Sequence, residues 1–279
     1  MDLKDLLDTP PWHWPRDAGK RFQKVLIDDR ASESDRLVAA ELAGGLTVVT
    51  DELAASLTAI VCNPNEPDRL RAKAAISLGP VLEQAYTFEF EDPDDVPITE
   101  RTFRHIQNSL EEVYCNETTP KGVRRRVLEA SVRAPESWHQ DAIGAAYSSG
   151  DKDWMLTAVF SMRWVRGFDE QILEALKSAH PEIHYEAVQA AGNWALAAAW
   201  PHVVAIVHDA GAPQPLLLAA IAAVASIRPA EARTVLADLA DSGDEEIAAA
   251  ALEAIAMAEA TPDEEDEEDD EDVGGEWIN

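Results

Sequence analysis

The chain has 279 residues and a formal net charge of −30 at pH 7, because 53 acidic residues outnumber 23 lysines and arginines. A field of this sign opposes binding to nucleic acid or to an anionic membrane surface, and no apolar run reaches the roughly 18 residues of a membrane span. Apolar residues make up 46% of the chain and aromatic residues only 6%. With its frequent alanine, this composition favours close-packed helices over a β-sandwich.

Residues 1–18 are expected to form an extended N-terminal cap. The run Pro10-Pro11-Trp12-His13-Trp14-Pro15 restricts the backbone to extended conformations, and its tryptophans can cover the first helices. The segment has no basic start followed by an apolar run, so no secretory signal is predicted. We therefore expect a cytoplasmic protein, in which Cys62 and Cys115 are reduced and buried within apolar helices.

Helical hairpins are predicted from residue 19 to residue 259 by a pattern that recurs seven times. Each copy has an apolar residue, three others, a small or apolar pair, another apolar residue and often glycine. The copies begin at Asp35, Leu70, Val123, Trp154, Ile183, Leu216 and Ile247, and the helices expected before them span about 19–28, 51–61, 99–115, 136–148, 168–178, 200–208 and 230–241. Apart from one gap of 53 residues, the starts lie 29–35 residues apart, the length of two short helices and their turns.

The apolar residues of each copy fall on one face of a helix. In the fifth copy, Ile183, Ala187, Val188 and Ala191 follow the spacing i, i+4, i+5, i+8. Asp151 and Asp244 stand before the fourth and seventh copies, at the position of a helix N-cap. Small residues on the apolar face allow neighbouring helices to approach closely, which stacked hairpins require.

The run from His180 to Gly192 resembles the short HEAT-like repeat first noted in phycobilin lyases, which usually reads D-P-x-V-R-x-x-A-A-x-A-L-G. The resemblance covers about residues 19–259, although the third, fourth and sixth copies lack the glycine. It implies an all-α, right-handed α-α superhelix of about seven helical hairpins. The second copy matches through Leu70, Arg71, Ala74, Ala75, Leu78 and Gly79, and the seventh through Asp244, Ile247, Ala251, Leu252 and Ile255.

Two acidic segments interrupt or follow the repeats. Residues 86–98, within the long gap, are acidic and contain two prolines and the aromatic residues Phe88 and Phe90, so we expect a solvent-exposed loop. Residues 260–279 contain eleven acids and no base, and a disordered acidic tail is predicted. Because Trp277 and Ile278 end this tail, it has the composition of a docking peptide, whose target could be a basic protein or the chain's own arginines; a solubilising tail remains the alternative.

No catalytic, cofactor-binding or metal-binding residues are predicted. His180 and His184 are four residues apart, with His202 and His208 nearby, but His180 precedes Pro181 at an expected N-cap and no cysteine or close carboxylate completes a metal set. The chain also lacks a G-x-S-x-G motif, a P-loop and a dinucleotide-binding glycine pattern.

A protein-binding surface has more support. The HEAT-like resemblance implies that the second helix of each hairpin lines the concave face, with outward positions two, three, six and ten residues after the start of each copy. Those positions hold Arg125, Arg126, Glu129 and Arg133; Leu156, Thr157, Phe160 and Trp164; and Tyr185, Glu186, Gln189 and Asn193. Exposed arginine beside large apolar side chains is typical of interaction hot spots. We select Arg125, Arg126, Arg133, Phe160, Trp164, Tyr185, Trp277 and Ile278 as candidate protein-binding residues.

Two alternatives compete with this interpretation of the surface. Phe160 and Trp164 would pack against a neighbouring hairpin if the helix phase differs by one residue. Arg124, Arg125 and Arg126 could instead neutralise nearby acids such as Glu129.

The predicted function is a non-catalytic scaffold or adaptor, monomeric and without a cofactor, that binds a protein or peptide on its concave face. A basic partner would suit the net charge. One alternative is a cofactor-handling or lyase-type enzyme resembling phycobilin lyases. Another is a DNA-binding or DNA-repair protein like the HEAT-like alkylpurine DNA glycosylases, which need a basic groove that this acidic chain does not offer.

Overall fold

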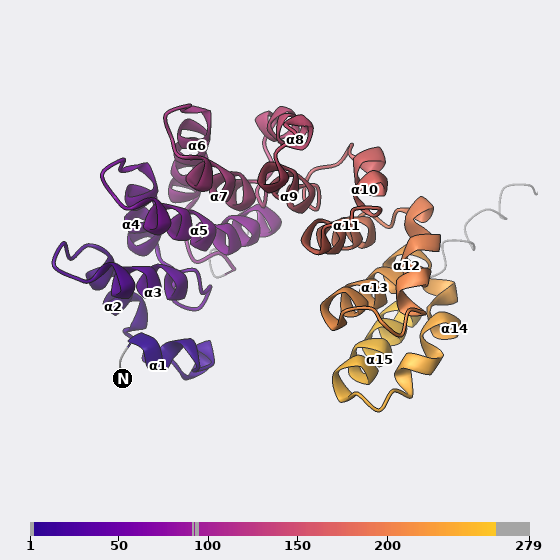
Figure 1. Cartoon of the computed structure of the whole chain (residues 1–279). Helices are drawn as coiled ribbons and strands as arrows, with labels where there is room; N and C mark the ends of the chain where they lie inside the picture. The colour runs from indigo at the N-terminus through magenta and orange to yellow at the C-terminus, as the bar shows by residue number, and fades with distance from the viewer. Residues whose placement is uncertain (1–2, 91, 93–94, 261–279) are drawn as a thin grey trace, which may run out of the picture. The chain divides into compact units, whose positions relative to one another are not determined.

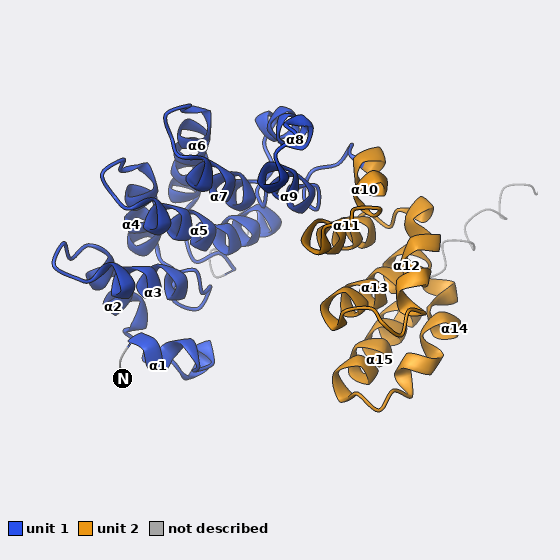
Figure 2. Ribbon diagram, in the orientation of Figure 1, with its two compact units in different colours: residues 1–168 blue, residues 169–279 orange. Residues whose placement is uncertain are grey.

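The computed structural model describes residues 3–90, 92 and 95–260, and over these residues it is entirely helical (Figure 1). It contains fifteen α-helices and two short 3-10 helices, at Pro11–His13 and Ala197–Ala199. The chain divides into two compact units, residues 1–168 and residues 169–279 (Figure 2). Each unit is built from consecutive helical hairpins.

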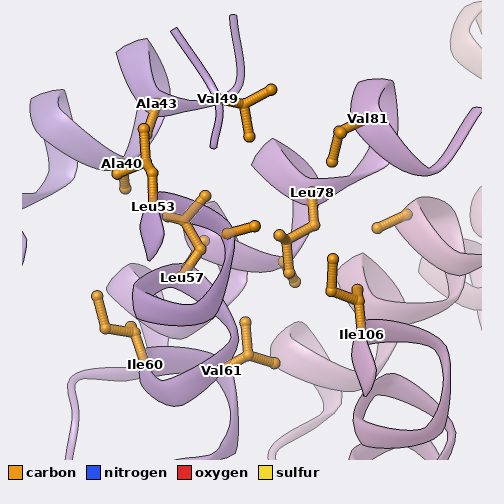
Figure 3. Close-up of a cluster of buried hydrophobic side chains, with 14 of the residues drawn as sticks. Ala40, Ala43, Val49, Leu53, Leu57, Ile60, Val61, Leu78, Val81 and Ile106 are labelled. Atoms are coloured by element: carbon orange, nitrogen blue, oxygen red, sulfur yellow. The ribbon is translucent and has the colours of Figure 1, made fainter. Parts of the chain in front are cut away.

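The first unit contains α1 and four hairpins arranged in two rows. The second helices, α3, α5, α7 and α9, contact one another in order, while α2 contacts α4 and α4 contacts α6. The bounds are α1 Leu3–Leu7, α2 Ala18–Leu26, α3 Glu33–Ala43, α4 Asp51–Cys62, α5 Asp68–Phe88, α6 Glu100–Cys115, α7 Lys121–Ser131, α8 Trp138–Ser148 and α9 Lys152–Ser161. Figure 3 shows the core between the rows, where Leu53 and Leu57 of α4 lie among side chains of α3, α5 and α6.

The second unit repeats the arrangement with three hairpins. Its second helices α11, α13 and α15 contact one another in order, and α12 contacts α14. The bounds are α10 Asp169–Ala175, α11 Pro181–Asn193, α12 Trp200–Val207, α13 Gln214–Ile227, α14 Pro229–Ala240 and α15 Glu245–Ala260. The predicted all-α architecture is therefore confirmed, with four stacked hairpins in the first unit and three in the second, and each recurring sequence copy forms a second helix.

Side chains at the helix starts fix where the helices begin. Ser32, Thr50 and Thr99 each accept a hydrogen bond from the backbone N–H three residues ahead, which stabilises the first turns of α3, α4 and α6. Asp151 and Asp244 do the same for α9 and α15, as predicted.

The glycine that recurs in the repeat is a spacing residue between successive second helices. A Cβ placed on Gly44 of the first copy would lie 3.1 Å from Ser77 Cα in α5, and one on Gly192 would lie 3.0 Å from Ala223 Cα in α13. Few real Cβ atoms lie this close to a neighbouring backbone, so the next helix would have to shift to admit one. Glycine at these two positions therefore permits the short distance between neighbouring second helices.

The N-terminal segment differs from the extended cap that the sequence suggested. Its first residues form the helix α1, which contacts α3 and buries Leu6. Trp14 stacks edge-on against Phe22 with 5.5 Å between ring centroids, whereas Trp12 is 77% exposed. One helical turn of Leu3 and Leu6 was too short to show a period in the sequence.

Two further expectations were wrong in part. The segment 86–98 is not simply a solvent loop, because α5 continues to Phe88, Phe90 packs against Phe103, and Val96 and Ile98 are buried. Both cysteines are exposed rather than buried, since each is the last residue of its helix, α4 or α6. The predicted acidic tail lies beyond the described residues, apart from Ala260 at the end of α15.

A buried histidine fixes the corner between α7 and α8. The Glu136 N–H donates to His139 Nδ1 (2.8 Å), so His139 Nε2 carries the proton and donates to Ser131 Oγ (2.9 Å). Burial lowers the pKa of His139 to about 4. The imidazole is therefore neutral in the folded protein at pH 7.

We expect the free energy of unfolding to fall as the pH drops from about 6.5 to about 4. Across this window His139 takes up a proton in the unfolded state but not in the folded state. The resulting loss in the free energy of unfolding is about 3 kcal/mol over the full pKa shift. Urea unfolding at a series of pH values should show this slope, and it should flatten in His139→Gln. An unchanged slope in the variant would show that another group is responsible.

Alanine at Gly192 should destabilise the second unit by about 1–3 kcal/mol, because its Cβ must push α13 away. Gly144, inside α8, is the matched control, since nothing lies within 4 Å of a Cβ there. Gly144→Ala should stabilise by about 0.5–1 kcal/mol through helix propensity. Chemical denaturation of both variants tests the contrast, and equal effects would refute the spacing role.

Candidate functional site

The candidate residues of the first unit lie on the neighbouring helices α7 and α9 and just beyond their ends. Arg125, Arg126, Arg133, Phe160 and Trp164 are all partly exposed, and we call them the α7–α9 surface. Two other positions expected to face outward are buried, Glu129 at 4% exposure and Thr157 at 0%. The buried pair lies beneath the arginines and holds them in place.

Glu129 is a buried carboxylate whose hydrogen bonds come from two helices. One oxygen accepts from Thr157 Oγ1 of α9 (2.6 Å), and the other pairs with Arg126 of its own helix. Arg125 donates to Thr157 Oγ1 (2.9 Å) and lies 3.9 Å from Glu129. The network satisfies a charge that would otherwise be costly to bury, and it joins α7 to α9.

A second ion-pair cluster joins the starts of the same two helices. Lys121 Nζ lies 2.6 Å from both oxygens of Asp151 and 2.9 Å from Asp153. The hydrogen bond from Lys121 lowers the pKa of both aspartates and raises that of the lysine. Asp153 also lies 3.5 Å from Arg125. These groups are solvent-exposed, so each ion pair contributes little to the free energy of unfolding.

The aromatic part of the surface is an ordered stack. The Phe160 and Trp164 ring centroids are 4.8 Å apart, and the guanidinium groups of Arg133 and Arg163 lie 5.0 and 4.9 Å from the Trp164 ring. Arg133 also pairs with Glu83 of α5 at 2.7 Å. Trp164 thus makes cation–π contacts with two arginines, and one of them, Arg133, is held by its ion pair with Glu83 of α5.

Gly79 makes room for this arrangement, which the sequence did not reveal. A Cβ at Gly79 would lie 2.9 Å from both Arg133 Cδ and Arg133 Nε, so the arginine crosses α5 where that helix has no side chain. The partners Glu83 and Arg133 are 50 residues apart in the sequence. A motif search restricted to one repeat could not have connected them.

Arg124, adjacent to the surface, points toward the other row of helices. Its Nε donates to the Tyr114 carbonyl (2.8 Å), and its guanidinium lies 5.1 Å from the Tyr114 ring and 5.8 Å from the Trp154 ring. Trp138 completes the cluster, 5.1 Å from Tyr114. Arg124 therefore joins hairpins and does not belong to the α7–α9 surface.

The three arginines of the α7–α9 surface pair with nearby acids, as the alternative interpretation expects, and they differ in exposure. Arg125 and Arg133 have side-chain exposures of 14% and 26% and are committed to contacts between repeats. Arg126, at 49%, presents half of its side chain to solvent while paired with Glu129. Phe160 and Trp164 stay partly exposed, so the helix phase is the predicted one at these residues.

Tyr185 lies on α11 in the second unit and lines a separate groove of about 350 Å³. Its hydroxyl accepts from Gln189 (3.1 Å), and across the groove Gln214 donates to Glu246 (2.9 Å). The remaining walls come from Pro215, Leu218, Ala219 and Ala222. The candidate residues Trp277 and Ile278 lie outside the described residues.

Two of the histidines considered as metal ligands lie close together. His180 is the N-cap of α11, as predicted, and the His184 and His202 rings meet edge-on with centroids 6.1 Å apart. Within residues 3–90, 92 and 95–260, no three histidine, cysteine or carboxylate side chains are grouped as a metal ion requires. No helix in the same residues is long and apolar enough to cross a membrane.

Comparison with known proteins yields little that bears on function. No protein-family model matches the chain, and no curated protein is significantly similar to it in sequence. Among solved structures, one similar chain is an engineered protein from the Northeast Structural Genomics Consortium. It is 16% identical, and the alignment covers 87% of this chain and 96% of that chain with a TM-score of 0.36.

We expect Arg125→Ala to destabilise the first unit by about 2 kcal/mol, because it leaves the buried Thr157 hydroxyl without its donor and removes a positive charge 3.9 Å from the buried Glu129. Arg126→Ala is the matched control on the same helix. It should cost less, about 1 kcal/mol or below, since water can replace a half-exposed side chain. Denaturant unfolding of each variant measures the difference, and a larger loss for Arg126→Ala would contradict the assigned network.

Proposed function

We propose that the chain is a non-catalytic scaffold of HEAT-like repeats, and that a protein or peptide partner binds it at the α7–α9 surface. The observation that carries this proposal is the stack of Phe160, Trp164, Arg133 and Arg163, which is ordered yet partly exposed. Large aromatic and arginine side chains contribute most of the binding energy in protein interfaces.

The stack is suited to binding because its side chains are already held. Trp164 contacts Phe160 and two guanidinium groups, and Arg133 is tied to Glu83. A partner therefore has little side-chain entropy to remove when it covers these groups, and the cost of association falls accordingly. An unsupported surface tryptophan such as Trp12, 77% exposed, lacks this advantage.

The charges beside the stack indicate the chemistry of the ligand. Arg126 presents a half-exposed guanidinium, whereas its partner Glu129 is buried and also receives the Thr157 hydroxyl. Arg126 can therefore donate to a second carboxylate, from a ligand, without leaving Glu129 unpaired. The ligand that fits best is a peptide segment with one large apolar side chain, which packs on the Phe160–Trp164 stack, and one carboxylate, which pairs with Arg126. A cytoplasmic location belongs to the same proposal, and the two free cysteines support it.

The test is loss of peptide binding in a Phe160→Ala/Trp164→Ala double variant. Peptides are selected from a random library against the full chain, and their affinities are measured by fluorescence anisotropy. We expect the double variant to bind the selected peptides at least tenfold more weakly, since each hot-spot side chain is worth about 2 kcal/mol. Arg126→Ala should weaken only peptides that carry a carboxylate.

Trp12→Ala is the control, because it removes an exposed tryptophan away from α7 and α9 and should leave affinity unchanged. Circular dichroism and thermal unfolding establish that each variant is folded. If peptides bind the double variant and the wild type equally well, the α7–α9 surface is not the binding site.

A further inference from the structure

The last repeat of the second unit leaves exposed a position that every other repeat buries. The sixth residue of each copy is at most 1% exposed in the first six copies and 56% exposed in the seventh, at Leu252. In sequence order these residues are Ala40, Ala75, Leu128, Val159, Val188, Ile221 and Leu252. No further described helix follows α15.

The helix α15 is mostly apolar, and only one of its sides is buried. Twelve of its sixteen residues are alanine, leucine, isoleucine or methionine. Only Ala251, Ala254 and Ala258 are buried, whereas the fourteen-residue α13 buries eight side chains. All four of its glutamates are exposed, and so is Leu252, so a large apolar side chain is left uncovered on the acidic side of α15. An exposed apolar side chain rimmed by polar groups is typical of an interaction site.

The other end of the stack shows what such a cover looks like. In the first unit α1 packs on α3, and its Leu6 is only 2% exposed. Among residues 169–260, no helix covers the exposed face of α15 in the way that α1 covers α3. The free apolar face is therefore a specific feature of the last repeat.

Carboxylates frame the exposed face. Glu245, Leu252 and Glu259 are spaced seven residues apart and so lie along one side of the helix, with Ala248 and Ile255 between them. Glu245 is exposed, and Glu259 is a half-exposed partner of Arg233. Residues 229–260 contain eight acids and one base, and residues 261–279 add eleven acids and no base. The field around Leu252 is strongly negative.

We infer that this face of α15 binds a basic amphipathic helix of a partner protein. Its apolar residues would cover Leu252 and Ile255, and its lysines or arginines would lie near Glu245 and Glu259. Those two carboxylates are fourteen residues apart, about 21 Å along the helix, so a partner helix of about four turns reaches both. A second copy of the chain, or residues 261–279 of the same chain, would bring further negative charge to the same place and is disfavoured for that reason.

The probe is a synthetic 18-residue helical peptide with leucines at i, i+3, i+4 and i+7 and lysines on its flanks. A matched peptide has glutamate in place of each lysine. Binding of both to the full chain is measured by fluorescence anisotropy at low salt. We expect the glutamate peptide to bind at least tenfold more weakly than the lysine peptide, and the lysine peptide to lose affinity as salt is raised.

Two leucine variants locate the contact. Leu252→Ser should weaken the lysine peptide at least tenfold without unfolding the chain, because the side chain is exposed. Leu46→Ser, which removes a leucine 42% exposed in the first unit, should have no effect. The Phe160→Ala/Trp164→Ala variant should bind the lysine peptide as the wild type does, so this inference and the proposed function succeed or fail separately.

Several results would overturn the inference. Equal binding of the two peptides would show that charge does not select the partner. If the lysine peptide binds Leu252→Ser as tightly as the wild type, its contact lies on acidic residues elsewhere. If neither peptide binds, the face is not available to a partner helix. A dimer seen by light scattering in the wild type and lost in Leu252→Ser would assign the face to a second copy.

Discussion

The close approach of successive second helices is the constraint on which the rest of each unit depends. At Gly44 and Gly192 the next second helix comes so near that a Cβ would meet its backbone at 3.0–3.1 Å. Small residues set this distance, and the distance decides which side chains are enclosed between repeats and which remain on the surface. At Gly79 the space is filled differently, because Arg133 crosses α5 there and reaches Glu83.

The α7–α9 surface lies where the third and fourth copies lack the repeat glycine. Its large side chains stack on one another, as Phe160 and Trp164 do, or pair across the row, as Arg133 does with Glu83. Glu129 and Thr157 are buried beneath them and join the two helices. On α15 the series of contacts between described second helices ends, and Leu252 is left exposed.

Much of the fold could be predicted because the repeat places small and apolar residues at a fixed period, and seven copies reinforce one another. The helix α1 was missed because five residues cannot show a period, and Val96 and Ile98 because single apolar residues among acids carry no signal of burial. The helix phase indicated which residues face outward. It could not show that Glu129 is buried, because the hydroxyl that makes this possible belongs to Thr157, 28 residues away in the next repeat.

The central claim is that Phe160 and Trp164 form a binding surface and are not merely an incompletely covered part of the core. Oxidative footprinting of the full chain, with and without a saturating library-selected peptide, tests this directly. The account predicts that Trp164 and Phe160 lose reactivity when the peptide is bound, while the exposed Trp12 keeps its own. Protection of other aromatic residues with Trp164 unchanged would contradict it.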